Sequence, residues 1–339
     1  MRQRLSPIEC DIKSLLCSRG EEAQYLRHCA ARTSEELFGR AVYVRGLIEI
    51  SSYCRNNCLY CGLRRSNSAA ERYRLTEEQI LECCNNGYSL GLRTFVLQGG
   101  EDGFWSDERL VPLISKMRAQ FPDAAITLSL GERSAESYKT LHAAGANRYL
   151  LRHEAANRGL YEAIHPADMS YDNRISAIDS LMEIGYQTGM GMMIGVPGQS
   201  IDDIVKDIEL IARLRPQMVG IGPFIPHPAT PFGNTEAGDI ELTLNAIAIV
   251  RQLLPNALIP ATTALATLSV EGHRIAIEAG ANVIMPNLSP ADVRSKYAIY
   301  TGKASSGTEA AEGLKALEAE LAEFGYTINY DKGDYNEHI

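Results

Sequence analysis

The strongest constraint on the fold is an alternation of short apolar runs with longer amphipathic segments along most of the chain. The runs are apolar at nearly every position, which is typical of parallel strands buried on both faces. Helical patterns lie between them, so the sequence predicts an α/β protein with a (β/α)8 TIM barrel. A partial barrel of six strands, in which the last two runs are not strands, is the alternative. The eight predicted strands are residues 47–51, 94–98, 125–130, 148–152, 189–194, 218–223, 257–261 and 282–285.

Local signals mark the ends of several predicted helices. Thr76-Glu-Glu-Gln79 forms a capping box, in which the Gln79 side chain can reach back to the Thr76 amide. Ser200 can cap the helix that follows it, whose isoleucines recur at helical spacing. Gly145 and Gly280 each end a helix just before a predicted strand.

Both ends of the chain lie outside the alternation. Residues 1–45 are predicted to be an N-terminal helical lead-in, with a capping box at Ser6-Pro-Ile-Glu9. Residues 46–303 form the predicted barrel. Residues 304–339 are predicted to be a C-terminal amphipathic helix and tail packed on the barrel.

Composition excludes several classes of protein. The 339 residues are 45% hydrophobic and 22% charged, which rules out a disordered chain. A net charge of −9 disfavours nucleic acids and anionic membranes as partners. No run approaches ~18 uninterrupted apolar residues, and the first residues lack the apolar core of a signal peptide. We therefore expect a cytoplasmic protein.

Three of the eight cysteines stand close together. Cys54, Cys58 and Cys61 follow the first predicted strand, at the barrel end where active sites are built. In a reducing compartment such cysteines bind metals or act in catalysis more often than they form disulfides. Three thiolates can hold three corners of a four-iron cluster and leave the fourth iron open. A zinc site completed by a distant histidine, or three unrelated thiols, is the alternative. The other five are predicted to be inert thiols on helices: Cys10, Cys17, Cys29, Cys83 and Cys84.

The cysteine segment resembles the CxxxCxxC signature of radical S-adenosylmethionine (radical SAM) enzymes. The resemblance implies that Cys54, Cys58 and Cys61 bind one [4Fe-4S] cluster and that Tyr60 lies beside the adenine of S-adenosyl-L-methionine (SAM). In that family the open iron chelates the methionine part of SAM. One electron then breaks the sulfonium C–S bond and yields a 5′-deoxyadenosyl radical, so the resemblance also implies a one-electron donor as partner.

Further segments match the SAM-binding parts of that family. Gln98-Gly99-Gly100-Glu101 resembles the turn that holds the amino group of SAM, and the glycines would let the backbone approach a ligand closely. An ordinary tight turn is the alternative.

Glu154 and Arg174 are implied to bind SAM as well. A carboxylate and a guanidinium near the barrel mouth could meet a ribose hydroxyl and a carboxylate of the cofactor. A structural Arg–Glu pair is the alternative.

Within the radical SAM enzymes, segments from about residue 45 to residue 303 resemble, in order, the HydE family of [FeFe]-hydrogenase maturases. The resemblance implies an organometallic substrate, a cysteine-bearing iron complex with CO and cyanide ligands. It also implies partner maturases that act before and after this step in H-cluster assembly. Radical SAM enzymes similar to methylornithine synthase or biotin synthase are the alternatives. The residues implied to line the substrate cavity are Arg152, Met218, Thr262, Thr263 and Tyr300.

Each of these residues has a simpler explanation. Met218 could be core packing, and Thr262 could pair only with nearby backbone. Some HydE proteins bind a second cluster after the last strand region, but residues 302–307 contain no cysteine here. A barrel that uses its cluster as an electron relay or iron sensor is the non-enzymatic hypothesis. It would need neither the glycine turn nor the charged residues at the barrel mouth.

Overall fold

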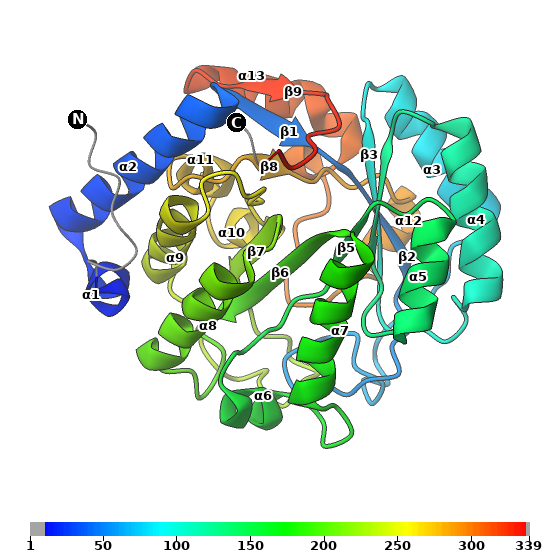
Figure 1. Ribbon diagram of the computed structural model, residues 1–339, viewed down its shortest axis with the longest axis horizontal. Helices are drawn as coiled ribbons and strands as arrows, with labels where there is room; N and C mark the ends of the chain where they lie inside the picture. Colours follow the sequence, from blue (N-terminus) through cyan, green and yellow to red (C-terminus); the bar gives the residue numbers. More distant parts are fainter. Residues whose placement is uncertain (1–10, 337–339) are drawn as a thin grey trace.

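A parallel six-stranded sheet forms most of a barrel in the computed structural model, which describes residues 11–336 (Figure 1). The strands follow one another in space in the same order as in the sequence. Helices cover the outside of the sheet, so the predicted (β/α)8 TIM-barrel class is confirmed. The six strands are β2 (Gly46–Ser51), β3 (Thr94–Gly99), β4 (Ala125–Ser129), β5 (Arg148–Leu150), β6 (Gln187–Ile194) and β7 (Met218–Pro223).

Single β-bridges close the rest of the barrel. The strand predicted at residues 257–261 is wrong as a strand, because this segment makes only isolated bridges. Pro260 lies in its middle and cannot donate to a ladder of hydrogen bonds. The last strand of the barrel, β8 (Val283–Ile284), is shorter than predicted. The bridges that complete the barrel join Met218 to Leu258, Pro260 to Val283, and Leu47 to Asn287.

A second, three-stranded sheet covers the N-terminal end of the barrel and was not predicted. Its order is β8-β1-β9, with β1 (Ala41–Val44) between β8 and β9 (Thr327–Asn329). β1 lies within the segment predicted to be a helical lead-in, so that segment is helical only in part. Both partners of β1 come from the far end of the sequence, and strands of three or four residues leave little local pattern.

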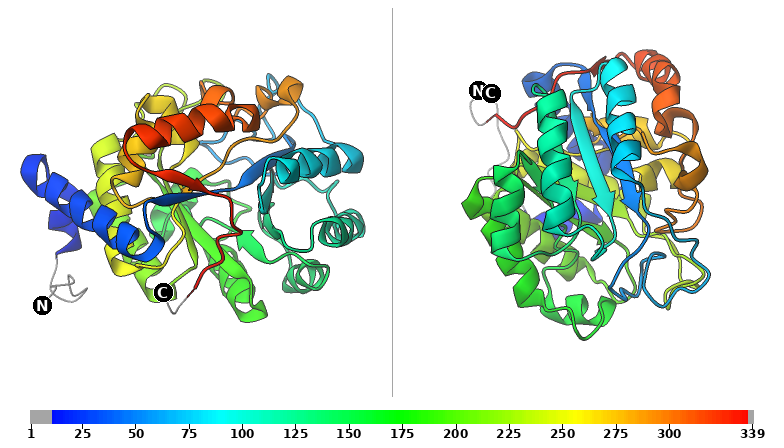
Figure 2. Two further views of the ribbon diagram at one scale, coloured as in Figure 1. Left: turned by 90° about the horizontal axis from the view of Figure 1, so that it is seen from above. Right: turned by 90° about the vertical axis from the view of Figure 1, so that its right-hand side faces the viewer.

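Thirteen α-helices lie within the described part of the chain, and most lie between successive strands of the barrel (Figures 1 and 2). They are α1 (Ile12–Cys17), α2 (Gly20–Phe38), α3 (Glu77–Ser89), α4 (Asp107–Gln120), α5 (Ala135–Ala143), α6 (Arg158–Ile164), α7 (Tyr171–Ile184), α8 (Ile201–Leu214), α9 (Ile240–Leu253), α10 (Thr263–Leu268), α11 (Gly272–Ile277), α12 (Ala291–Arg294) and α13 (Leu314–Glu323), with two 3-10 turns, η1 (Gly307–Glu309) and η2 (Ala311–Gly313). None of these helices is long and apolar enough to cross a membrane.

The predicted helix ends are largely confirmed. Thr76 and Gln79 form the expected capping box, and Ser200 caps α8. Gly145 and Gly280 follow α5 and α11 with φ angles of 120° and 103°, in the left-handed region that favours glycine. The capping box predicted at Ser6 and the thiol of Cys10 lie outside the described residues.

The strands point their carboxyl ends toward one edge, where the loops are longest (Figure 2, right). On the inner face, the wall formed by β6 and β7 is lined with glycines, and Gly191 pairs with Gly220. Gly220 is only half-buried although it lies in the middle of β7, and a Cβ atom there would meet no atom closer than 3.9 Å. The barrel lumen is therefore open on this side.

Candidate active site

The three clustered cysteines lie on the loop after β2, at the carboxyl edge of the barrel. Cys54, Cys58 and Cys61 are all half-buried. The loop is tied to its surroundings through the backbone, because the Leu59 amide donates to the Ile164 carbonyl at the end of α6 (2.9 Å). The structure thus brings the three predicted ligands together on one anchored loop.

Burial raises the pKa of each of these thiols. For Cys61 the pKa rises to about 12, first through burial and then through the neighbouring charge of Cys54. The pKa of Cys58 is raised in the same way by burial, Cys61 and Cys54. Three buried thiolates that repel one another require cations between them, which is the role of iron in a cluster. Among residues 11–336, no group of three or more His, Cys, Asp or Glu side chains is arranged to hold a single metal ion.

Arg72 anchors the cysteine loop through its backbone carbonyls. The sequence analysis did not identify this residue. Its guanidinium donates to four backbone carbonyls, which belong to Ser52, Leu63 (3.0 Å), Arg64 (2.8 Å) and Asn67 (3.3 Å). Its charge also favours the thiolates of the first and third cysteines, against the larger effect of burial. No local pattern reveals such a role, because it depends on where distant carbonyls meet.

The glycine turn after β3 packs against the cysteine loop. A Cβ atom on Gly100 would overlap the Tyr53 carbonyl oxygen and lie 2.7 Å from Cβ of Cys54. A Cβ on Gly99 would make only ordinary contacts, from 3.4 Å. Gly100 therefore has a packing reason of its own to be glycine, in addition to any approach of a ligand.

The polar residues on either side of this turn are engaged with the protein. One carboxylate oxygen of Glu101 accepts from the Glu132 amide (2.9 Å), and the other accepts from Arg55 (3.0 Å). Gln98 donates from Nε2 to the Tyr297 hydroxyl (3.4 Å). Two backbone hydrogen bonds also fix the turn, because the Gly100 amide donates to the Ser51 carbonyl (3.4 Å) and the Arg55 amide donates to the Glu101 carbonyl (2.9 Å).

Tyr60 is held by a buried histidine. Its hydroxyl lies 3.0 Å from Nε2 of His165, whose Nδ1 lies 2.8 Å from the Tyr161 carbonyl. Burial, with a smaller contribution from Arg174, lowers the pKa of His165 to about 3, so its imidazole is neutral. A carbonyl can only accept, so Nδ1 carries the proton and Nε2 accepts from Tyr60. The ring of Tyr60 is therefore fixed beside the cysteine loop.

Glu154 has a strained backbone just beyond β5, the fourth strand of the barrel. Its φ angle is 64°, which is unusual for a residue other than glycine. Its side chain is buried and lies 3.2 Å from the Arg152 guanidinium. Strain of this kind collects at functional sites, because the surrounding structure must maintain it.

Arg174 takes a different partner from Glu154. It donates to the Glu132 carboxylate (2.5 Å) and to the Arg152 carbonyl (2.5 Å). The alternative to SAM binding was a structural Arg–Glu pair. The structure has two such pairs, Arg174–Glu132 and Arg152–Glu154, and Arg174 and Glu154 do not pair with each other. Both pairs lie at the mouth of the barrel.

The lumen below this mouth contains buried polar groups without partners. Within the described residues, Nε of Arg152 and Oγ1 of Thr262 have no hydrogen-bond partner, and Nη2 of Arg152 lies 3.2 Å from Oε2 of Glu154 as an ion pair without hydrogen-bond geometry. Thr262 lies close to the glycine wall, because a Cβ on Gly222 would be 2.9 Å from its hydroxyl. An unsatisfied buried donor costs about 1–3 kcal/mol, so these groups are suited to a polar ligand or water.

Two of the other predicted substrate residues lie near Arg152 and Thr262, and the third lies deeper in the barrel. Burial raises the pKa of the Tyr300 phenol, which the charge of Arg152 lowers in turn, so the two side chains lie within electrostatic reach. Met218 is at the amino end of β7, where its Sδ accepts from Arg45 (3.2 Å) and its side chain packs in the core with Leu258 and Val283. Thr263 is the half-buried first residue of α10, directly after Thr262.

Sequence reasoning missed several polar residues of the lumen. Arg45 is buried, with Nε and Nη2 unpartnered in the described structure. Thr127 has an unpartnered buried hydroxyl there as well. Glu49 is fully buried and pairs with Lys303 (2.6 Å). A charged residue in an apolar strand, such as Glu49 in β2, was the signal that could have identified this set.

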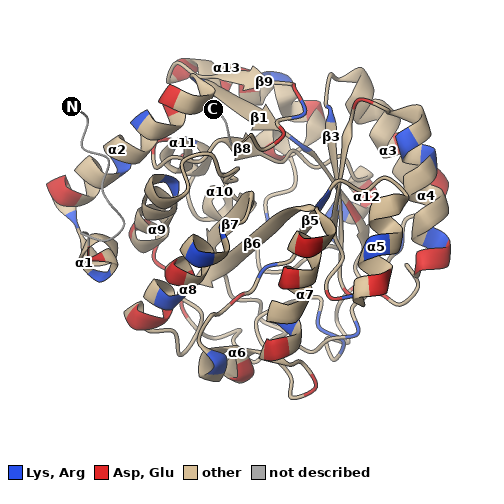
Figure 3. Cartoon of the chain, in the orientation of Figure 1, with Lys and Arg blue, Asp and Glu red and all other residues tan. Residues whose placement is uncertain are grey.

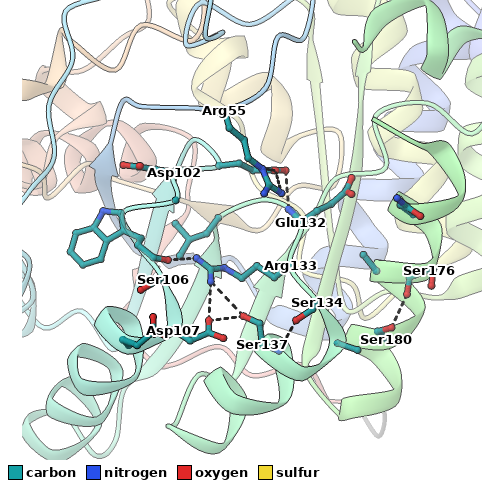
Figure 4. A pocket seen from close by; sticks show the side chains of 18 residues that line it. Arg55, Asp102, Ser106, Asp107, Glu132, Arg133, Ser134, Ser137, Ser176 and Ser180 are labelled. Atoms are coloured by element: carbon teal, nitrogen blue, oxygen red, sulfur yellow. Dashed lines mark hydrogen bonds and ion pairs between the residues drawn. The ribbon is translucent and has the colours of Figure 1, made fainter. Parts of the chain in front are cut away.

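A separate cavity of about 680 Å³ lies outside the barrel mouth, between the β3–α4 loop, α5 and α7 (Figure 4). Its charged side chains are paired within the protein. Arg133 lies against Asp107 (3.0 Å), and Arg55 lies against Glu101 (3.0 Å). The cavity includes none of the residues predicted to bind the substrate.

Comparisons with known proteins agree with this geometry. Residues 48–211 match the model of the radical SAM superfamily. The chain is 47% identical over 265 residues to the [FeFe] hydrogenase maturase subunit HydE of Thermotoga maritima, covering 78% of this chain and 75% of that protein. It is 29% identical to 3-methylornithine synthase of Methanosarcina acetivorans, over 83% of this chain and 79% of that protein.

Solved structures share the fold over nearly the whole chain. Methylornithine synthase (PylB) superposes with a TM-score of 0.83 at 25% identity, covering 94% of this chain and 93% of that one. HydG, a maturase of the [FeFe]-hydrogenase, superposes with a TM-score of 0.77 at 20% identity, covering 95% and 72%.

Proposed function

The chain belongs to the radical SAM superfamily and within it to the family of the [FeFe]-hydrogenase maturase HydE, and from this premise we propose that it acts on a cysteine-bearing organometallic iron complex during H-cluster maturation. The observation that carries the proposal is the group of unpartnered buried donors of Arg152 and Thr262 below the cysteine loop. A cation and a hydroxyl in this position suit the carboxylate of an amino acid.

The residues present fit one [4Fe-4S] cluster and SAM. Cys54, Cys58 and Cys61 would hold the cluster, and their repelling buried thiolates are suited to it. When bound, these cofactors supply the 5′-deoxyadenosyl radical. The chain's own residues then have to bind, orient and shield.

Residues at the barrel mouth would bind SAM. The backbone of Gln98, Gly99, Gly100 and Glu101 would hold its amino group, at a turn whose side chains are already engaged. Tyr60, Glu154 and Arg174 would contact the rest of the cofactor. Arg174 is held by Glu132, and Glu154 is held by Arg152. Both side chains would therefore meet SAM in orientations that these ion pairs already fix.

Residues deeper in the lumen would bind the substrate. Arg152, Thr262 and Thr263 would hold its carboxylate, while Tyr300 forms part of the wall and Met218 part of the floor. Gly220 on β7, where a Cβ atom would meet no atom closer than 3.9 Å, leaves room for a compact complex. A lumen enclosed by loops on one side and a second sheet on the other keeps water away from a radical.

We propose two kinds of partner and a cytoplasmic location. The cluster needs a one-electron donor. The substrate and the product would connect this chain to the other maturases of the [FeFe]-hydrogenase, as its similarity to the HydE maturase subunit of Thermotoga maritima implies.

The test replaces HydE by this protein in a maturation assay with the partner maturases and an apo-hydrogenase. We expect hydrogenase activity to appear with the parent protein and not with Cys58→Ala. The methylornithine synthase alternative is favoured by the structural match to PylB. Conversion of lysine to methylornithine, with no hydrogenase activity, would move the assignment to that alternative.

A further inference from the structure

The surface around the cysteine loop is basic, although the chain as a whole has a net charge of −9. The acidic side chain of this segment is Glu71, which pairs with Lys296 (3.0 Å). Within residues 53–74 five arginines therefore outnumber one acid, and the two acids that reach this segment from the loop after β3, Glu101 and Asp102, are largely buried in their pairs with Arg55 and Arg74. The arginines of residues 53–74 are Arg55, Arg64, Arg65, Arg72 and Arg74.

Next to the first cysteine, arginines and aromatic rings form a stack. The guanidinium of Arg74 lies 3.8 Å from the ring centre of Tyr53 and 4.9 Å from that of Phe104. The guanidinium of Arg109, on α4, lies 4.0 Å from the centre of the same Phe104 ring. The stack begins at Tyr53, the residue directly before Cys54, and Tyr53 is 37% exposed.

The stack is held in place from within. Asp102 accepts from two nitrogens of Arg74, at 2.6 and 2.9 Å, and from the Ser51 hydroxyl at 2.7 Å. The Asp102 side chain is itself almost completely buried. A partner would therefore meet side chains that are already ordered, so little conformational entropy is lost on binding.

Two more exposed arginines belong to the same loop. Arg55 has a side chain that is 66% exposed, although it pairs with Glu101. Arg65 is exposed, and its amide donates to the Asn56 carbonyl (2.8 Å), which places it beside Arg55 in the loop. Exposed cations thus gather next to the cysteines, on loops that lie at the lower edge of the molecule in Figure 3.

We infer that this surface docks an acidic one-electron carrier protein. We call it the arginine–aromatic surface and define it as Tyr53, Arg55, Arg65, Arg74, Phe104 and Arg109. The inference rests on the proposed function, because only a cluster at Cys54, Cys58 and Cys61 needs such a donor. One electron leaves the flavin or iron–sulfur centre of the carrier and enters the cluster. The carrier is oxidised by one electron, the cluster is reduced by one, and no bond or proton moves.

Charge complementarity favours this kind of partner over others. An acidic carrier is repelled by an acidic chain except where the local charge is positive, so the positive surface steers its approach. Arginine and aromatic residues are also the types enriched in protein interfaces, and lysines are not. The positive charge and the arginine and aromatic side chains both lie beside the cysteine loop, which is the loop that an electron has to reach.

The test reverses two charges at the margin of the surface, in Arg65→Glu/Arg109→Glu. Neither residue contacts the cysteines or the residues proposed to bind SAM. The matched control is Lys139→Glu/Lys315→Glu, which makes the same change in charge at exposed sites on α5 and α13. The probe is an acidic flavodoxin, whose affinity for the cluster-loaded protein is measured by calorimetry at low and at high salt.

We expect the surface variant to bind the flavodoxin about tenfold more weakly at low salt, and the control to bind it within about twofold of the parent. The difference should vanish at high salt, because screening removes interactions between exposed charges. Equal affinity of the parent and the surface variant at low salt would overturn the inference. Arg65→Gln/Arg109→Gln serves as a milder second variant, with an expected loss of about half the effect in free energy.

A small-molecule reductant separates this inference from the proposed function. Reduced methyl viologen, a cation, needs no docking surface. SAM cleavage driven by viologen should be the same in the parent, the surface variant and the control. Absence of viologen-driven cleavage in the parent would contradict the proposed function. Intact cleavage with unchanged flavodoxin binding would contradict the docking surface alone.

Discussion

Two arginines on β5 and its continuation show how the two ends of the barrel differ. Arg148 and Arg152 are four residues apart along an extended segment, so their side chains point to the same side, which is the inside of the barrel. At the N-terminal end, Arg148 donates to Thr94, to two carbonyls of the C-terminal tail and to Asp334. At the carboxyl end, Nε and Nη2 of Arg152 have no hydrogen-bond partner in the described structure.

The difference separates a structural cation from a functional one. Around Arg148 the chain provides acceptors for both terminal nitrogens, and Nε is the one nitrogen of this side chain left without a partner in the described structure. The protein itself therefore closes most of this end. Around Arg152 the chain provides one carboxylate, Glu154, on a strained backbone. Groups that a fold leaves unsatisfied at such a cost are suited to a ligand that arrives later. Changes at the two ends should therefore have opposite consequences for stability and for activity.

The largest effect is expected at the carboxyl edge. Cys58→Ala should abolish the cluster, because two thiolates do not hold it, so iron should fall from about four per chain to near zero after anaerobic reconstitution. The melting temperature of the protein without iron should hardly change, since the thiol is half-buried and charge-repelled. A normal cluster in this variant would show that Cys58 is not a ligand.

The next effect compares the two arginines directly. Arg148→Met should lower the free energy of unfolding by about 1–3 kcal/mol, because the tail carbonyls lose a buried donor. Arg152→Met/Glu154→Gln removes both charges of its ion pair, so it should cost less stability than Arg148→Met, and it should reduce turnover of the substrate by about 100-fold. Denaturant unfolding and product formation measure the two properties. A large loss of stability in Arg152→Met/Glu154→Gln would remove the distinction between the ends.

A smaller effect is expected for the cofactor. Arg174→Ala should weaken SAM binding about tenfold or more, because a hydrogen bond to a charged group contributes roughly 1.5–3 kcal/mol. Glu132→Gln is a useful companion variant, because it removes the charge that pairs with Arg174 and keeps its acceptor oxygen. Equilibrium dialysis with SAM gives the affinities. Unchanged affinity in Arg174→Ala would show that this arginine serves only the Glu132 pair.

The sequence predicted the parts of this molecule that depend on local pattern. Apolar runs located β2 to β7, and capping residues such as Thr76 located helix ends, because both signals lie within a few residues. The strand at residues 257–261 failed because Pro260 interrupts its ladder, and β1 was missed because its partners come from the far end of the chain. For the site, the spacing of the cysteines predicted a cluster on the loop after β2, and the structure places all three on that loop. The roles of Arg45, Arg72 and Thr127 arise from long-range contacts that no local pattern contains.

The smallest effect is a pH dependence at the closed end. Burial alone would raise the pKa of Asp334, but Lys332 and Arg148 outweigh it and lower the pKa from 3.8 to about 2. A carboxyl whose pKa is lower in the folded state stabilises the fold above its ordinary pKa, and this contribution is lost as the pH falls toward 2. The parent should therefore be more stable than Asp334→Asn above about pH 4, and the two should converge between about pH 4 and pH 2.

Unfolding in urea across this range of pH measures the difference in stability between the parent and Asp334→Asn. The effect should be modest, because Asp334 is 41% exposed and solvent weakens its pairing. If the difference stayed constant down to pH 2, the carboxylate would not be what holds the tail on Arg148, and the carbonyls of Lys332 and Gly333 would have to close this end of the barrel.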